Sequence, residues 1–215
     1  MIKGVIFDLD GTLIDSMNVW CETDRIFLKE NGVVNPPEDI SERVKKLTVD
    51  KSAELFIKEF GLECSVGYIV KRIEEIVQNE YFYNIQLKNG VIKLLDFLDR
   101  TGIPYGVATV TYKNLAEAVL KRHGIYDRMK FLLTVAEFPQ GKKTPDMYMK
   151  CAEIMGFTPE NVLIAEDSLH CIETASCVGF ITAGIYDSFS ENDKENIIKI
   201  SDYYFYKISE IKSIV

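Results

Sequence analysis

The chemistry open to this sequence begins with two carboxylates one residue apart, Asp8 and Asp10, which end the apolar run 5–7. A carboxylate can attack phosphorus and carry the phosphoryl group as an aspartyl-phosphate. A second carboxylate nearby can protonate the leaving oxygen and later deprotonate the attacking water. Two acids at the end of a buried segment are costly unless their charge is compensated, and a divalent cation would compensate it. The alternative is a turn in which both side chains only cap backbone amides.

A second acidic pair, Glu166 and Asp167, follows the apolar residues 162–165. Carboxylates are hard oxygen ligands, and Mg²⁺ uses one or two of them together with waters and substrate phosphate. The pair therefore indicates a magnesium site. The alternative is that Asp167 and Ser168 cap the next helix, and capping does not exclude metal binding.

Two further segments carry groups suited to a phosphate. Thr109 supplies a hydroxyl where a helix begins, and backbone amides at a helix N-terminus bind phosphate well; Val110 can contribute only its N–H. Lys142 lies just before another helix, where its ammonium could screen a phosphate and a nucleophile. Lys143 is adjacent, and paired lysines in a loop are also typical of a solvated surface. We expect Lys142 to be the lysine that points inward.

Each of these four groups lies at the end of a predicted strand or just past it. The strands are expected at residues 5–7, 105–110, 131–135, 162–165, 180–186 and 203–205, and helices alternate with them from residue 88 onward. This alternation predicts βαβ units and a parallel sheet, and right-handed crossovers make it a doubly wound α/β fold. Because the carboxyl ends of parallel strands open on one crevice, we expect the four groups to meet there.

Residues 16–84 interrupt the alternation, because they contain helical periodicity and no strand signal. The economical interpretation is an all-helical domain, residues 16–84, inserted after the first strand of a core domain formed by residues 1–15 and 85–215. The alternative is one α/β domain with additional packing helices.

The pattern Asp-x-Asp-Gly-Thr at residues 8–12 resembles the signature of the haloacid dehalogenase-like (HAD) superfamily. The groups at 109–110, 142–146 and 166–168 fall in the order of that family's later motifs. The inserted helices resemble the cap of its β-phosphoglucomutase-like phosphatase group. The resemblance covers the whole chain and implies a Rossmann-like HAD core with an all-helical cap. It departs from the family pattern Gly-Lys-Pro-x-Pro-Asp at Lys143, which replaces the first proline.

The resemblance also implies roles in catalysis. Asp8 would be the nucleophile and Asp10 the general acid/base. Thr109, the backbone of Val110, and Lys142 would hold the phosphate. Because the family's dehalogenases lack the second acid of the first motif, Asp10 favours phosphoryl chemistry over cleavage of a carbon–halogen bond.

A magnesium ion is the cofactor that the resemblance implies. Its ligands would be Asp8, the backbone carbonyl of Asp10, and Asp167, while Glu166 would hold a metal-bound water. Mg²⁺ favours such a set of hard oxygen donors.

The acceptor of the phosphoryl group decides the reaction: water makes the protein a phosphatase, and a hydroxyl of a bound sugar phosphate makes it a mutase. The family's β-phosphoglucomutases carry a His in the segment that matches Trp20 and a phosphate-clamping Arg near the position of Val49. Neither is present, although Arg43 and Lys45 or Lys51 could substitute. We therefore expect a Mg²⁺-dependent phosphatase acting on a small, sugar-like phosphomonoester, with a hexose-phosphate mutase as the alternative.

A third hypothesis is a phospho-accepting receiver module without enzymatic activity. Receivers also place acids, a hydroxyl and a lysine at the ends of parallel strands. A receiver needs about half this length, and it has neither a helical insertion after its first strand nor the pattern of residues 8–12.

Composition limits the partners. The net charge is −8, from 25 Lys and Arg against 33 Asp and Glu, and no basic run is present, so nucleic acid and anionic membranes are disfavoured as partners. Five cysteines without a CxxC pair indicate reduced thiols. With neither a signal peptide nor a long apolar run in the sequence, we expect a cytoplasmic monomer or weak dimer that binds a small phosphorylated metabolite.

Overall fold

The computed structural model describes residues 1–44, 47 and 49–215. The chain divides into two compact units, and each is described by itself. The first consists of Met1–Asp15 with Ile85–Val215, and the second of Ser16–Asn84. That the second unit acts as a cap for the first stays a prediction.

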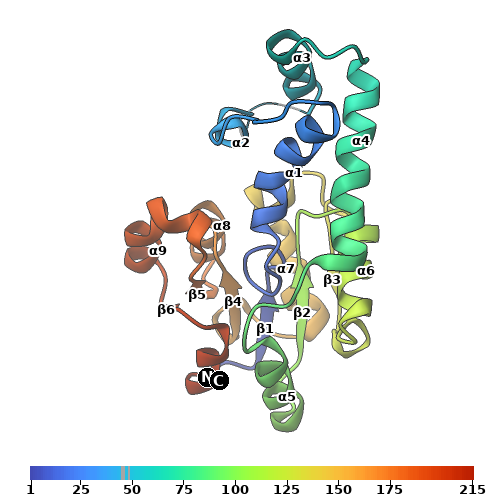
Figure 1. Cartoon of the computed structure of the whole chain (residues 1–215). Coiled ribbons are helices and arrows are strands. Elements are labelled where there is room, and N and C mark those ends of the chain that lie inside the picture. Colours follow the sequence, from blue (N-terminus) through green and yellow to red (C-terminus); the bar gives the residue numbers. More distant parts are fainter. Residues whose placement is uncertain (45–46, 48) are drawn as a thin grey trace. The chain divides into compact units, whose positions relative to one another are not determined.

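The first unit is built on a parallel sheet (Figure 1). Within the described residues the sheet has six strands in the order β3-β2-β1-β4-β5-β6. The strands are β1 Gly4–Phe7, β2 Tyr105–Ala108, β3 Leu132–Leu133, β4 Val162–Glu166, β5 Ile181–Ile185 and β6 Tyr203–Phe205. The chain order reverses next to β1, and this is the switch point at which open α/β sheets bind ligands.

The two central strands carry no polar side chain before the last residue of β4, because both faces of the sheet are covered. Every residue of β1 and β4 is buried, including Glu166 at the end of β4. Phe7 pairs with Ala165, and the next N–H, that of Asp8, donates to the carbonyl of Ala165 at 3.0 Å. This register brings the ends of the two strands, and hence both acidic pairs, to the same edge.

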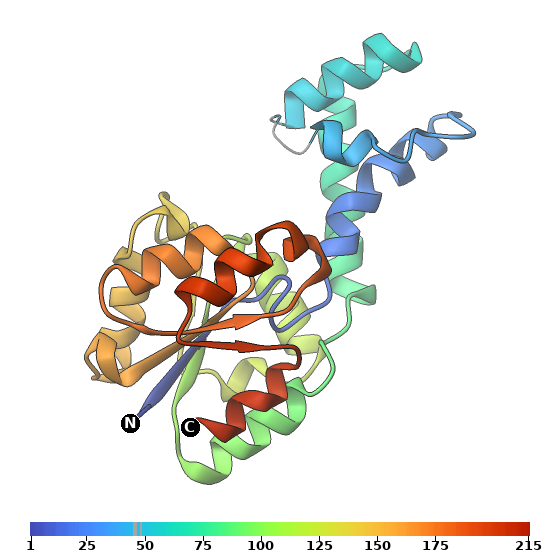
Figure 2. The same ribbon diagram turned by 90° about the vertical axis from the view of Figure 1, so that its left-hand side faces the viewer.

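Helices cover both faces of the sheet. In Figure 2 the orange and red helices α8 and α9 lie on one side and the green helix α5 on the other. A buried cluster including Ile6, Met147, Tyr148 and Ile164 joins the sheet to α7. The helices of this unit are α5 Val91–Thr101, α6 Lys113–Arg122, α7 Asp146–Met155, α8 Leu169–Ser176 and α9 Lys194–Ile200. The predicted doubly wound α/β architecture is confirmed.

The bounds of several predicted elements differ from the observed ones; the strand expected at 105–110, for example, is Tyr105–Ala108. The strand expected at 131–135 is only Leu132–Leu133, because Thr134 begins a turn in which its N–H and hydroxyl both donate to Glu137 Oε2. Helix α9 begins at Lys194, after the 3₁₀ segment Ser188–Asp193. Asp187 starts that segment by accepting the N–H of Phe189 at 2.9 Å.

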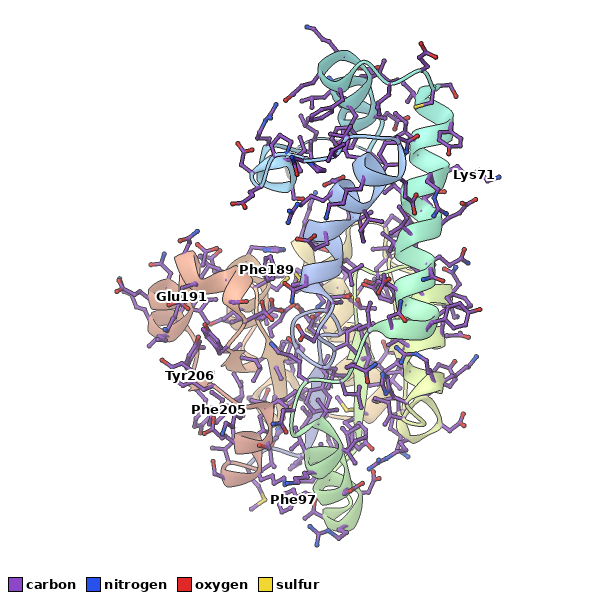
Figure 3. All side chains as sticks on the ribbon, viewed as in Figure 1. Lys71, Phe97, Phe189, Glu191, Phe205 and Tyr206 are labelled. Carbon is purple, nitrogen blue, oxygen red and sulfur yellow. The ribbon has the colours of Figure 1, made fainter. Side chains whose placement is uncertain are left out.

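Strand β6 forms one edge of the sheet and is rich in aromatic residues. Tyr203 and Phe205 stack with their ring centroids 6.1 Å apart, and Tyr206 follows with 60% of its surface exposed. Phe205, Tyr206 and the nearby Glu191 are labelled in Figure 3.

The second unit contains helices throughout its described part. These are α1 Met17–Glu30, α2 Ile40–Val44, α3 Val49–Phe60 and α4 Val66–Asn79, followed by the π-helical turn Glu80–Asn84. Their apolar stripes form a separate core in which Phe27 and Phe56 stack at 6.1 Å between ring centroids. Ser65 caps α4 by accepting the N–H of Tyr68. Ser16 occupies the N-cap position of α1, yet its side chain makes no capping hydrogen bond.

The two segments that lead out of the first unit and back into it pair with each other. Asp15 N–H donates to the carbonyl of Gln86, and Lys88 N–H donates to that of Leu13, both at 2.9 Å. Backbone hydrogen bonds therefore join the segment at residues 13–15, which follows the loop after β1, to the segment at residues 86–88. Among the described residues, none of the helices combines the length and the apolar character that crossing a membrane requires.

Candidate active site

Three carboxylates meet where β1 and β4 end. Asp8 follows β1, Glu166 is the last residue of β4, and Asp167 follows it. One oxygen from each lies within 4.8 Å of the others, and all three side chains are buried. The strand register produces this cluster, since it places Asp8 beside the end of β4.

A single buried ammonium faces two of these carboxylates. Lys142 is 2% exposed; its Nζ donates to Asp8 Oδ1 and, at 2.7 Å, to Glu166 Oε1. Gly141 turns the chain with φ at +57°, and the neighbouring Lys143 is exposed. The structure thus distinguishes the two lysines: Lys142 points into the cluster and Lys143 does not.

The described cluster has more acidic groups than basic ones, because three carboxylates lie around the single ammonium of Lys142. Burial, together with the nearby Glu166 and Asp10, raises the pKa of Asp8 to about 8 in spite of Lys142. Burial, together with the nearby Glu166 and Asp8, raises the pKa of Asp167 well above its ordinary value. Glu166 is the exception: burial opposes its ionisation, but Lys142 lowers its pKa.

A divalent cation fits this environment. The donors are carboxylate oxygens of the kind that Mg²⁺ prefers, and a bound cation would stabilise the ionised forms of Asp8 and Asp167 that burial disfavours. The cluster contains Asp8, Glu166 and Asp167; the carboxylate of Asp10 is not part of it.

The loop after β1 packs closely against Asp167. A Cβ added to Gly11, whose φ is +79°, would lie 2.6 Å from Asp167 Oδ2, so a side chain has no room there. Thr12 Oγ1 donates to Asp167 Oδ1 at 3.2 Å, and Ser190 Oγ reaches Asp167 Oδ2 at 3.5 Å. This geometry explains why Gly11 and Thr12 follow the two aspartates. Glycine leaves room for the carboxylate of Asp167, and the threonine hydroxyl donates a hydrogen bond to it.

Glu166 is held through both of its oxygens. Oε2 accepts the N–H groups of Asp167 at 2.8 Å and Ser168 at 3.0 Å, while Oε1 faces Lys142. Ser168 occupies the N-cap position of α8, but its side chain makes no capping hydrogen bond. The alternative cap by Ser168 is therefore absent, and Glu166 Oε2 instead accepts the N–H groups of the two residues that precede α8.

Asp10 is positioned by a residue of the segment after β2. Thr111 Oγ1 donates to Asp10 Oδ2, and the N–H of Thr111 in turn donates to Thr109 Oγ1 at 3.1 Å. Thr109 is fully buried, whereas the side chain of Val110 is exposed. The candidate phosphate-binding segment is thereby joined to the first acidic pair through Thr111.

Sequence reasoning did not assign roles to several residues of this site. Thr111 lies in the segment that was singled out, and a second hydroxyl two residues after Thr109 was the available signal. Tyr148, whose OH reaches Glu166 Oε1 at 3.5 Å, and Ser190 had no such signal, because each comes from an element remote in the chain.

Comparisons with known proteins agree with this geometry. Residues 5–185 match the model of the family described as haloacid dehalogenase-like hydrolase. The chain is 25% identical over 187 residues to N-acetylmuramic acid 6-phosphate phosphatase of Pseudomonas aeruginosa, covering 86% of this chain and 81% of that one. It is 28% identical over 166 residues to hexitol phosphatase A of Escherichia coli, covering 77% and 74%.

Solved structures show the same fold. The crystal structure of a Thermotoga maritima protein described as a candidate beta-phosphoglucomutase superposes with a TM-score of 0.87 at 23% identity, over 99% of this chain and 98% of the other. The family match extends from β1 to the end of β5 and contains all four groups of site residues. With the parallel sheet and the acidic cluster at its switch point, this match means that the chain belongs to the haloacid dehalogenase-like hydrolase family.

Proposed function

We propose that this protein is a Mg²⁺-dependent phosphatase that hydrolyses a small, sugar-like phosphomonoester through an aspartyl-phosphate. The observation that carries the proposal is the meeting of Asp8, Lys142, Glu166 and Asp167 at the ends of two adjacent strands. A buried carboxylate beside a fixed ammonium can serve as the covalent acceptor for a phosphoryl group.

Hydrogen bonds support the proposed roles of Lys142 and Thr111, and the position of the remaining residues at strand ends supports theirs. Asp8 is the nucleophile, and Lys142 holds its carboxylate in place and opposes the negative charge that the phosphoryl oxygens bring. Asp10 is the general acid/base, and the hydroxyl of Thr111 orients it. Thr109 and the backbone of Val110 bind the phosphate at the end of β2.

Asp8, Asp167 and the backbone carbonyl of Asp10 would hold the magnesium ion, with Glu166 supporting a metal-bound water. When bound, the ion would neutralise phosphate oxygens and keep Asp8 ionised. Around the site, Glu166 holds Lys142, Lys142 orients Asp8, and Thr12 orients Asp167.

The substrate class rests on chemistry and on the names of relatives. Two relatives are named for phosphatase activity on a phosphorylated sugar acid and on hexitols. We therefore propose a small phosphorylated carbohydrate as the substrate class. That the protein is a cytoplasmic monomer or weak dimer stays a prediction. The helical unit, residues 16–84, is proposed as a cap that excludes water during the transfer.

The mutase alternative requires a second phosphate site in the helical unit. Arg43, one of the cations that could supply it, is engaged by Glu59, whose Oε1 accepts its Nη1 at 2.9 Å. Lys45, another candidate, lies outside the described residues. With Val49 where the mutases place an arginine, hydrolysis is favoured over positional transfer. A non-enzymatic receiver is less favoured still, because it gives Asp10 no role.

Phosphate release from a panel of sugar and polyol phosphates tests the proposal. We expect Mg²⁺-dependent release by the wild-type protein and none by Asp8→Asn, whereas Asp127→Asn, which makes the same change at an exposed carboxylate, keeps full activity. Transfer of phosphate between positions of one sugar without free phosphate would establish the mutase instead. If no substrate loses phosphate and Asp8→Asn behaves as the wild type, the phosphatase proposal fails.

A further inference from the structure

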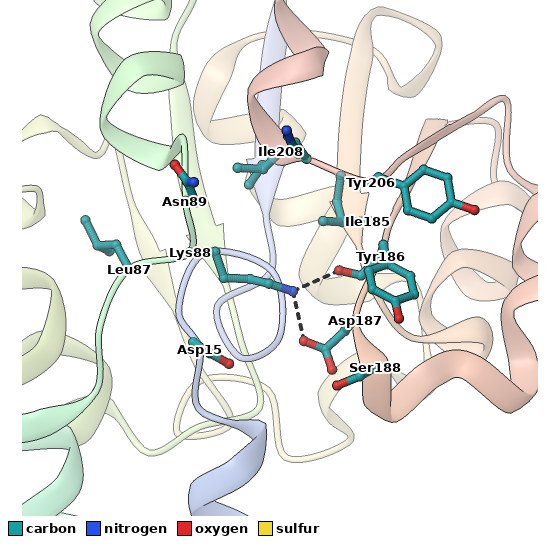
Figure 4. A pocket seen from close by; sticks show the side chains of 11 residues that line it. Asp15, Leu87, Lys88, Asn89, Ile185, Tyr186, Asp187, Ser188, Tyr206 and Ile208 are labelled. Carbon is teal, nitrogen blue, oxygen red and sulfur yellow. Dashed lines mark hydrogen bonds and ion pairs between the residues drawn. The ribbon is translucent and has the colours of Figure 1, made fainter.

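Lys88 connects two loops of the core and has no role in the proposed chemistry. It lies on the segment that returns to the core, just before α5, and its side chain is only 19% exposed. Its ammonium donates to the carbonyl of Gly11, to the carbonyl of Tyr186 at 2.9 Å and to Asp187 Oδ2 at 2.8 Å. Figure 4 shows Lys88 between the loop after β1 and the end of β5.

These three bonds leave the ammonium no role in substrate binding. A lysine ammonium has three N–H donors, and Gly11, Tyr186 and Asp187 accept all three. Asp187 is fixed as well, because its Oδ1 accepts the N–H of Phe189 at 2.9 Å and its side chain is 5% exposed. The pair is thus a rigid bridge between two loops.

The loop held by this bridge is the one that carries the proposed chemistry. Gly11 separates Asp10 from Thr12, and its Cα faces the carboxylate of Asp167 with no room for a side chain. On the opposite side, the carbonyl of Gly11 is bonded to Lys88. The segment after β5 approaches the cluster a second time, where Ser190 reaches Asp167 Oδ2. Displacing the Gly11 carbonyl would therefore shift both Asp10 and the surface that Asp167 packs on.

We propose that Lys88 and Asp187 form a positioning pair that holds the loop at residues 10–12 in the geometry needed for the cation and for proton transfer. The proposal deepens the proposed function and rests on it for the identity of the reaction. Neither residue touches the reacting atoms. Their part is to fix the backbone that carries Asp10, as outer groups around metal sites orient the ligands.

Charge and position predict opposite signs, which makes the proposal testable. If Lys88 acted only through its charge, removing the ammonium would strengthen binding of a divalent cation, because a nearby positive charge repels it. If Lys88 acts through the bridge, removing it weakens binding. The double variant Lys88→Met/Asp187→Asn removes both charges of the pair at once, so the local net charge stays the same and only the bridge is lost.

The experiment measures Mn²⁺ affinity of the full chain by electron paramagnetic resonance of the free ion, so it does not depend on turnover. We expect the double variant to bind Mn²⁺ about tenfold more weakly than the wild type, the range seen when outer groups at metal sites are removed. Lys207→Met, which changes an exposed lysine lining the same cavity, should leave the affinity unchanged. Affinity of the double variant equal to or tighter than that of the wild type overturns the proposal.

The cavity beside Lys88 allows a rescue experiment. It has a volume of about 310 Å³ and is lined by Asp15, Lys88, Asp187 and Tyr206 among others. Lys88→Ala leaves Cβ in place and removes three carbons and the ammonium, which is the size of n-propylammonium. We expect n-propylammonium to restore Mn²⁺ affinity and to raise the melting temperature of Lys88→Ala, and 1-propanol to do neither. No difference between the two additives contradicts the proposal even if the double variant fails to fold.

Activity measurements separate this inference from the proposed function. With the preferred phosphomonoester, we expect the double variant to lower kcat by about tenfold while KM changes little, because the pair positions Asp10 rather than the substrate. If the wild type releases no phosphate but Mn²⁺ affinity still depends on the bridge, the phosphatase proposal fails and the positioning pair stands. If the wild type is active and the double variant binds Mn²⁺ as tightly as the wild type, the phosphatase proposal stands and the positioning pair fails.

Discussion

Lys142 and Lys143 are adjacent in the chain and opposite in environment. Lys142 is buried and bonded to Asp8 and Glu166, whereas Lys143 is exposed. The pair therefore provides a matched test, because Lys→Met at either position removes one charge and leaves an unbranched side chain of similar length.

We predict that Lys142→Met lowers kcat by about 10²–10³-fold, the usual effect of removing one preorganised group that opposes developing charge. Lys143→Met should stay close to the wild type. Steady-state phosphate release with the preferred substrate measures both variants. Equal losses in the two variants would mean that neither ammonium acts at the nucleophile.

Thr111 is the residue that fixes the proposed general acid/base. Its hydroxyl donates to Asp10 Oδ2, and a valine of the same shape cannot replace that bond. We predict that Thr111→Val lowers kcat roughly tenfold with little change in KM, a part of the 10²–10⁴-fold that general acid–base catalysis contributes.

Thr111→Ser retains the hydroxyl and should retain most of the activity. Comparing the three proteins at saturating substrate separates loss of the bond from loss of shape. A Thr111→Val protein as active as the wild type would remove Thr111 from the mechanism.

At the scale of single elements, α3 shows how the second unit is held together. Phe56 is fully buried against Phe27 of α1 and belongs to the apolar stripe that the periodicity of this helix indicated. We predict that Phe56→Ala destabilises the second unit by about 3–5 kcal/mol, because truncating a buried phenylalanine leaves a cavity.

Hydrogen exchange measures this effect locally. Amides of α1 and α4 should lose protection in Phe56→Ala, while amides of β1 and β4, which belong to the other unit, should keep theirs. Tyr83→Ala, at an exposed aromatic residue of the same unit, serves as the control. Loss of protection confined to β1 and β4 would contradict the assignment of Phe56 to a separate core.

The elements that carry the site were largely predictable from the sequence. In one case, a local interaction explains why an observed element is shorter than the predicted one. Apolar runs located β1 and β4 because strands buried on both faces have no polar residues until they end. The strand at 131–135 was predicted too long, because a side-chain turn at Thr134 competes with the sheet for the backbone. Such local competition depends on Glu137 folding back, which periodicity does not reveal.

On the scale of the whole molecule, the excess of negative charge at one edge of the sheet predicts a pH dependence. The pKa of Asp8 is raised from its ordinary 3.8 to about 8, mainly by burial. In the metal-free protein the folded state therefore retains a proton that the unfolded chain has lost. This contribution to stability is complete below about pH 4 and is lost as the pH rises toward 8.

We predict that the melting temperature of the metal-free protein falls between pH 5 and pH 8.5 and that Asp8→Asn falls less. Added Mg²⁺ should raise the melting temperature more at pH 8.5 than at pH 5.5, because protons compete with the cation for the carboxylates. Scanning calorimetry with chelator or with Mg²⁺ measures all of these differences. A stabilisation by Mg²⁺ that is the same at both pH values would argue against the acidic cluster as its site.

The sequence by itself determined which residues stand at the ends of the buried strands, since alternating apolar runs and helices leave Asp8, Thr109 and Glu166 only that place. Only the tertiary structure decided that Lys142 bonds both acids, that Thr111 holds Asp10, and that Lys88 and Asp187 join two loops. The physical reason is that periodicity records the burial of each residue, a local property. Hydrogen bonds between distant loops depend on the register and spacing of whole elements, which become defined only when the sheet and its helices pack.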